Sequence, residues 1–172
     1  MRHIAPALLL AGSLFAADPI VSAFKPRYET AKKNFVESAA AMPASAMEYK
    51  LTPEQRSFGG WLSHTAGMNF NTCASLAGKP APANDSAKAK TKEEIQTVLK
   101  ASFEYCDQVI GTLTDAQAVS ELTVGKRKVV PVDLMFGYIA NLNAHYGNMV
   151  GYMRTKGVVP PSTARAAAQH KH

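Results

Sequence analysis

Two histidines on separate predicted helices are the side chains in this sequence best suited to chemistry. His145 is in register with the apolar residues Leu142 and Met149, so we expect it to point into the protein. His64 lies near the edge of the apolar stripe of its own segment. Two inward imidazoles from different helices can bind a divalent metal ion in their neutral form. The alternative is that each is an ordinary core or boundary histidine.

Asn141 precedes His145 by one helical turn and therefore shares its face of the helix. An amide oxygen is a weak, hard metal ligand compared with imidazole or carboxylate. Asn141 could instead be a hydrogen-bond partner for His145 or for a backbone carbonyl. The spacing alone leaves both roles open.

Cys73 and Cys106 are the only cysteines, which excludes a four-cysteine zinc site and a dense disulfide scaffold. They stand equally far from the starts of two predicted helices, at residues 58 and 91. If these helices run parallel, the two cysteines lie at similar depth and can bond; if they run antiparallel, the cysteines lie at different heights. In an oxidising compartment the pair predicts a disulfide, and in a reducing one it predicts buried thiols.

The first 17 residues have the pattern of an export signal. Arg2 and His3 precede an uncharged run over residues 4–17, which ends at Asp18. A transmembrane helix needs about 20 apolar residues, so the run fits a signal peptide better than a membrane anchor or a buried helix. Cleavage is expected after Ala16 or Ala17, with a second candidate site after Ala23. We therefore expect a periplasmic or secreted protein that has no stable membrane insertion once the signal is removed, and this favours the disulfide.

The elements that must position these side chains are four amphipathic helices. Apolar residues recur at spacings of three and four over residues 25–42, 58–76, 91–113 and 132–156. Thr52 and Pro53 also form a good helix start, ahead of the main body of the second helix. A loop over 78–90, a small β-ribbon over 122–130 and a flexible tail over 162–172 complete the chain. The pattern predicts an all-α four-helix bundle over residues 18–161. In an exported protein, the two cysteines favour a long crossover between the second and third helices.

Composition narrows the function classes further. The chain has 172 residues, enough for one domain, and a net charge of +6 that is spread along it with no run of five like charges, so nucleic-acid binding is not expected. The motifs CxxCH, GxGxxG, GxxxxGK[ST], GxSxG and HExxH do not occur. Most large cofactor classes are therefore not expected.

Several short motifs together resemble those of the DinB-like superfamily. These motifs are residues 33–39, 42–43, 56–64, 100–103 and 145–147 and the YxRxxGVVPP segment over 152–161. The resemblance extends over essentially the whole chain after the signal, from about Ala23 to Ser162. The resemblance implies an up-down-down-up four-helix bundle. It also implies a metal site made by one histidine of the second helix and an HxxxH pair of the fourth.

Carried onto this sequence, His64 matches the first of these ligands and His145 the last, while the middle ligand falls on Asn141. The site therefore departs from the family pattern, and losing one imidazole of three weakens affinity for zinc, nickel or iron. Relatives of this kind include metal-dependent transferases that activate thiols, and hydrolase-like members.

Three functions follow as hypotheses. The first is an exported DinB-like protein whose degenerate divalent-metal site activates water or a thiol. The second is a non-enzymatic bundle that binds a small molecule, with Asn141 and His145 as hydrogen-bonding groups. The third is a structural or partner-binding module, including a homodimer formed through helix faces. Whether the protein is an enzyme is left open.

Overall fold

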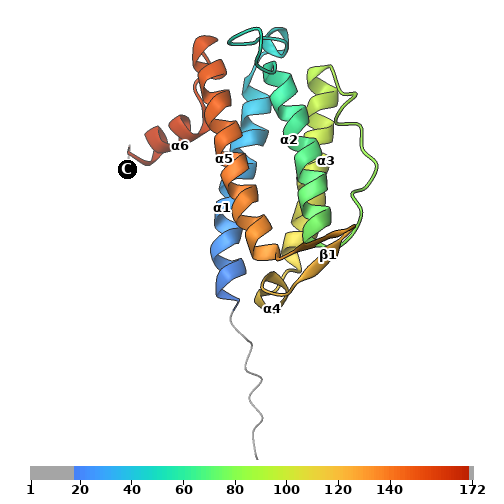
Figure 1. Cartoon of the computed structure of the whole chain (residues 1–172). Coiled ribbons are helices and arrows are strands. Elements are labelled where there is room, and N and C mark those ends of the chain that lie inside the picture. Colours follow the sequence, from blue (N-terminus) through green and yellow to red (C-terminus); the bar gives the residue numbers. More distant parts are fainter. Residues whose placement is uncertain (1–17, 171–172) are drawn as a thin grey trace, which may run out of the picture.

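Four long helices form a bundle in the computed structural model, which describes residues 18–170 (Figure 1). They are α1 (Pro19–Ala41), α2 (Phe58–Leu76), α3 (Lys92–Gly111) and α5 (Pro131–Thr155). The shorter elements are a 3₁₀ turn η1 (Ala44–Ala46), helix α4 (Asp115–Ala118), an antiparallel hairpin of β1 (Leu122–Val124) and β2 (Arg127–Val129), and helix α6 (Pro161–Gln169). The predicted four-helix bundle is confirmed, and the predicted ribbon is the β1–β2 hairpin. The predicted signal peptide, residues 1–17, lies outside the described residues.

Helices α2 and α3 run in the same direction and pack closely. The first turns of the two helices are in close contact at Gly59. A Cβ added at this residue would lie only 2.8 Å from Ile95 Cδ1. Farther along, Asn69 Nδ2 donates a hydrogen bond to Ser102 Oγ at 3.0 Å. Near their ends, Cys73 and Cys106 lie at disulfide-bonding distance, with Cα atoms 5.3 Å apart.

Helix α1 packs between α3 and α5 on the other side of the bundle. Tyr28 lies near the C-terminal end of α3, where its hydroxyl donates to Asp107 Oδ1 at 2.8 Å, whereas Gln96 near the start of α3 donates to the Ala39 carbonyl. Helix α1 is therefore antiparallel to α3. Aromatic rings of α1 and α5 are in contact at Tyr28–Tyr138 and again at Phe35–Tyr146. Residue numbers increase in the same direction on both helices, so α1 and α5 are parallel.

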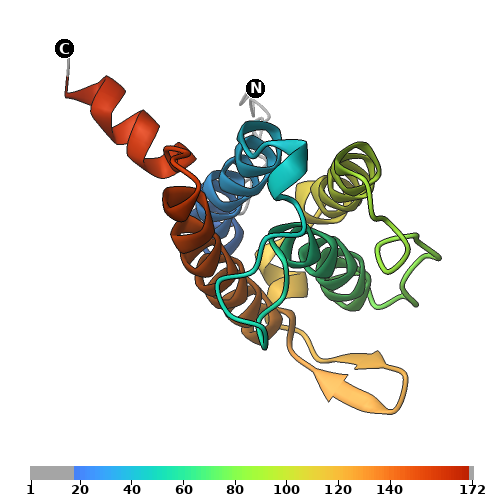
Figure 2. The ribbon, with the colours of Figure 1, turned by 90° about the horizontal axis from the view of Figure 1, so that it is seen from above.

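The parallel pairing of α2 and α3 requires a connection that returns along the bundle. Residues 77–91 form this crossover on the outside of the two helices (Figure 2). The disulfide closes a loop of 33 residues that contains it. In the chain-entropy account, such a loop stabilises the folded state by roughly 3–4 kcal/mol.

Capping groups determine where the helices begin. The start of α3 agrees with the sequence-based prediction, whereas the starts of α1 and α2 differ from it. Helix α3 begins with the predicted capping box of Thr91 and Glu94. Helix α2 is capped by Ser57, whose side chain accepts from the Gly60 N–H, and the predicted start at Thr52 is instead a turn. Helix α1 begins at Pro19 rather than near residue 25.

The chain after α5 also differs from the prediction. A flexible tail is predicted from residue 162, but Pro161–Gln169 forms helix α6. The Arg165 guanidinium bonds to Glu37 and Asn34 of α1, and Tyr146 Oη donates to Ser162 Oγ at 2.8 Å. These contacts attach α6 to the bundle. Over residues 18–170, no helix combines the length and apolar character needed to cross a membrane.

Candidate functional site

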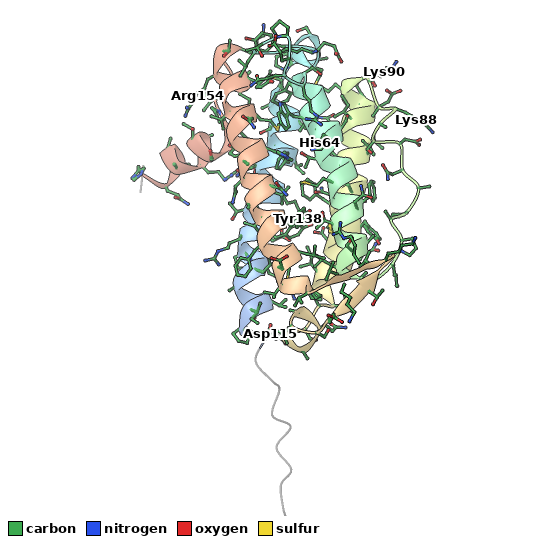
Figure 3. The ribbon with its side chains drawn as sticks, viewed as in Figure 1. His64, Lys88, Lys90, Asp115, Tyr138 and Arg154 are labelled. Carbon is green, nitrogen blue, oxygen red and sulfur yellow. A yellow bond between two sulfur atoms is a disulfide. The ribbon has the colours of Figure 1, made fainter. Side chains whose placement is uncertain are left out.

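Helices α2 and α5 bring His64 and His145 together. The two ring centres lie 5.1 Å apart, with the ring planes inclined by 58°. Both side chains are half-buried. Figure 3 shows His64 nearer than Tyr138 to the end of the bundle at which α2 begins. The sequence placed these histidines on two separate helices, and the antiparallel packing of α2 and α5 makes them neighbours.

Trp61 forms one wall of the histidine pair. Its ring centre lies 5.1 Å from that of His145 and 6.2 Å from that of His64. The indole Nε1 donates to the Tyr152 hydroxyl at 3.2 Å, and that hydroxyl donates to the Arg56 carbonyl at 2.7 Å. This chain of hydrogen bonds fixes the indole relative to both helices.

Burial and a nearby cation keep both imidazoles neutral at pH 7. Burial lowers the pKa of His64, and the positive charge of Arg56 lowers it further. Burial also lowers the pKa of His145, with smaller contributions from His64 and Arg56. The exposed Arg56 guanidinium lies 5.2 Å from the centre of the Trp61 ring. Neutral imidazoles can accept a proton or a metal ion, whereas protonated ones can do neither.

The histidine pair meets the distance requirement of a shared metal ion. An ion about 2.0–2.1 Å from one nitrogen of each ring, at a tetrahedral angle, places the ring centres roughly 5 Å apart. In addition, His145 Nδ1 is buried and has no hydrogen-bond partner within residues 18–170. A buried polar atom without a partner is energetically costly, so it calls for an explanation. The two residues therefore fit a two-imidazole site.

Asn141 lies at the exposed edge of α5, one turn before His145. The structure gives its side chain no hydrogen bond to His145 or to another described residue, so its expected role as a hydrogen-bond partner is not observed. In the described part of the chain, no three His, Cys, Asp or Glu side chains gather closely enough to hold a metal ion. Within residues 18–170, the histidine pair therefore has no third ligand of these four types close by.

An open pocket of about 630 Å³, with both polar and apolar walls, adjoins His64 between α2 and the crossover. Ser63, Asn71, Ser86 and Lys90 line it with His64, and the Ser63 hydroxyl is buried without a partner in the described residues. Neither Asn141 nor His145 lines this cavity. His64 is thus shared between the histidine pair and the cavity.

Comparisons with known proteins identify the fold. A DinB-like protein from Bacillus cereus ATCC 10987 is similar over 81% of this chain and 95% of its own, with a TM-score of 0.67 and 14% sequence identity. YfiT from Bacillus subtilis, a probable metal-dependent hydrolase with an unusual four-helix bundle topology, is similar over 86% of this chain and 93% of its own, with a TM-score of 0.64 and 13% identity.

No family model matches the sequence, and no curated protein matches it. The two structural similarities show that the chain has the fold of DinB-like proteins, in agreement with the resemblance seen in its motifs.

Sequence reasoning did not assign Trp61 and Arg56 to the site. Trp61 stands three residues before His64, a spacing that places both on one face of a helix, and this signal could have been used. Arg56 lies outside helix α2, so no periodicity pointed to it. Of the motif residues on α5, Arg154 is exposed and Tyr152 is buried.

Proposed function

We propose that this protein binds one divalent transition-metal ion through His64 and His145. The observation that carries the proposal is the buried, unpartnered Nδ1 of His145 in a ring centred 5.1 Å from that of His64. Asn141 stands at the position of a third ligand, and two protein imidazoles leave further positions for small molecules. The similarity in fold to YfiT, a probable metal-dependent hydrolase, supports this proposal.

The residues around the pair suit the activation of water or a thiol. A bound divalent ion lowers the pKa of a coordinated water or thiol, which supplies a nucleophile at neutral pH. Trp61 shields the two imidazoles on one side, and the neutral state of both rings keeps their lone pairs available. The positive charge of Arg56 opposes a cation here, although its exposure to solvent weakens that effect. We expect zinc, nickel or iron, in an exported protein.

Elemental analysis of the purified protein tests the proposal. We expect close to one zinc, nickel or iron per chain in the wild type, and loss of that metal in His64→Ala and in His145→Ala. His170→Ala, which changes an exposed histidine at the end of α6, should keep the metal. Thermal unfolding of each variant shows whether it remains folded. A wild-type protein without metal, or equal metal in all four proteins, would overturn the proposal.

The cavity beside His64 favours a second candidate function, the binding of a small polar molecule without catalysis. Its volume of about 630 Å³ is in the range of ligand sites, and hydroxyl, amide and amino groups line it. If the wild type carries no metal, we expect Ser63→Val to alter ligand binding in a screen of polar metabolites. His145→Ala should leave that binding unchanged, because His145 does not line the cavity.

A further inference from the structure

The most exposed large apolar side chain in the described part of the protein is Phe136, at 73% of its full surface. It stands in the second turn of α5, beside a groove between α1 and α5 of about 640 Å³. The groove is mainly apolar, and Ile20, Phe24, Met135 and Ile139 line it together with Phe136. A protruding aromatic ring next to an apolar groove is typical of an interaction surface.

This surface is separate from the histidine pair. Phe136 and His145 are nine residues apart on α5, which is two and a half turns, so their side chains leave opposite sides of the helix. The His64 cavity contains none of the groove residues. The surface therefore calls for an explanation that the proposed metal site does not supply.

Two side chains of opposite charge, one on α1 and one on α5, lie near the groove. Arg27 lines the groove on the α1 side, and Asp133 stands one turn before Phe136 on the α5 side. Both are exposed, and neither has an ion-pair partner within residues 18–170. The α1 side of the surface is thus positive and the α5 side negative.

We propose that two copies of this chain form a two-fold dimer through this surface. A two-fold axis sets α1 of one copy against α5 of its partner. The partner's Phe136 then enters the groove, and Arg27 pairs with the partner's Asp133. Because the axis is two-fold, each of these contacts occurs twice in the dimer. A second copy covers the protruding face of Phe136 and pairs both charges. A small apolar ligand in the groove would leave Arg27 and Asp133 unpaired.

Sedimentation velocity over a roughly hundredfold range of concentration tests the dimer. We expect a dimer in the wild type, and a dimer dissociation constant raised by about tenfold or more in Phe136→Glu. Val159→Glu is the matched control, because Val159 is 60% exposed and lies beyond the end of α5. It should dimerise as the wild type does.

Charge reversal gives a second, independent readout that does not depend on Phe136. Arg27→Asp and Asp133→Arg should each weaken the dimer, and the double variant should recover it, because the reversed charges again attract. A wild type that stays monomeric throughout, or a Phe136→Glu variant that dimerises as tightly as Val159→Glu, would overturn the proposal. So would a double variant no better than its parents, or a monomer that carries an apolar small molecule in native mass spectrometry.

Discussion

At the scale of single residues, the candidate site is defined by what surrounds two imidazoles. Burial lowers the pKa of both His64 and His145, Arg56 adds to this effect, and the Trp61 ring lies beside both imidazoles. A carboxylate in the place of Arg56 would instead raise both pKa values. The site is therefore built for neutral imidazoles that have few protein partners.

The position of Asn141 leads to a prediction of gained affinity. Asn141→His should raise the affinity for zinc by about tenfold or more, because it supplies an imidazole one turn from His145. Asn143→His is the matched control, since it makes the same exchange two residues away, where the side chain leaves another face of α5. Competition with a chromogenic chelator measures both affinities. Equal affinity in the two variants would contradict the placement of Asn141 beside the site.

The sequence predicted part of this site. Helical periodicity identified His64 and His145 and, for His145, the direction of the side chain. The exposure of Asn141 could not be predicted, because residues one turn apart can lie on either side of a core boundary. Arg56 was not assigned because its approach to Trp61 depends on the turn before α2, which follows no simple pattern.

At the scale of elements, the start of α1 is determined by a residue far along the chain. The Asp115 carboxylate of α4 accepts hydrogen bonds from the Ile20 and Val21 backbone N–H groups, both at 2.9 Å. In return, Asp18 accepts from the Asp115 N–H at 2.7 Å. A negative charge at the first turn of a helix satisfies unpaired N–H groups and opposes the positive end of the helix dipole.

Removal of this cap should destabilise the bundle. We expect Asp115→Ala to lower the free energy of unfolding by about 1–2 kcal/mol, because two N–H groups lose their acceptor. Asp85→Ala is the control, since Asp85 makes only an exposed pair with Lys88 and should have an effect below about 1 kcal/mol. Urea titration followed by circular dichroism measures both. Equal losses in the two variants would show that the Asp115 cap contributes little.

The helix bodies were predictable and their ends were less so. Apolar periodicity identified α2, α3 and α5, and local capping chemistry identified Thr91. The start of α1 and the whole of α6 were missed because distant residues hold them: Asp115 for the former, and Glu37 with Asn34 for the latter. Each helix does begin with a proline at its first position, which is a local start signal, but the distant partners themselves cannot be read from the sequence.

At the scale of the whole molecule, buried tyrosines connect all four long helices, since the Tyr28 hydroxyl of α1 also donates to Asp107 of α3. Tyr138 Oη of α5 donates to Asn69 Oδ1 of α2 at 2.8 Å, and Tyr28 of α1 lies against the Tyr138 ring. Burial raises the pKa of Tyr28 most, with further contributions from Tyr138 and Asp107. Burial also raises the pKa of Tyr138, to which Asp107 adds.

These two tyrosines should make the protein unstable in alkali. Above pH 10 the unfolded chain loses its tyrosine protons while the folded protein keeps those of Tyr28 and Tyr138. The unfolded state then binds fewer protons, so the free energy of unfolding falls as pH rises, by up to about 1.4 kcal/mol per pH unit for each tyrosine. Below pH 10 this contribution is fully present.

Urea titrations between pH 9 and about pH 11 measure this slope. Tyr138→Phe should roughly halve the part of the slope that comes from the two tyrosines, because one of the two groups is gone. Tyr105→Phe is the matched control, since Tyr105 is partly exposed, and it should keep the wild-type slope. An unchanged slope in Tyr138→Phe would contradict the assignment.

The crossover over residues 77–91 has a consequence for the covalent integrity of the protein. It is exposed for much of its length, and Lys88 within it has 81% of its side chain accessible. The disulfide joins residues on either side of it. A protease that cuts the crossover once therefore produces two polypeptides that stay joined by the sulfur bridge, with α1 and α2 on one and α3 and α5 on the other. Such a nicked protein keeps its helix pairs in place, and its two pieces separate only after both denaturation and reduction.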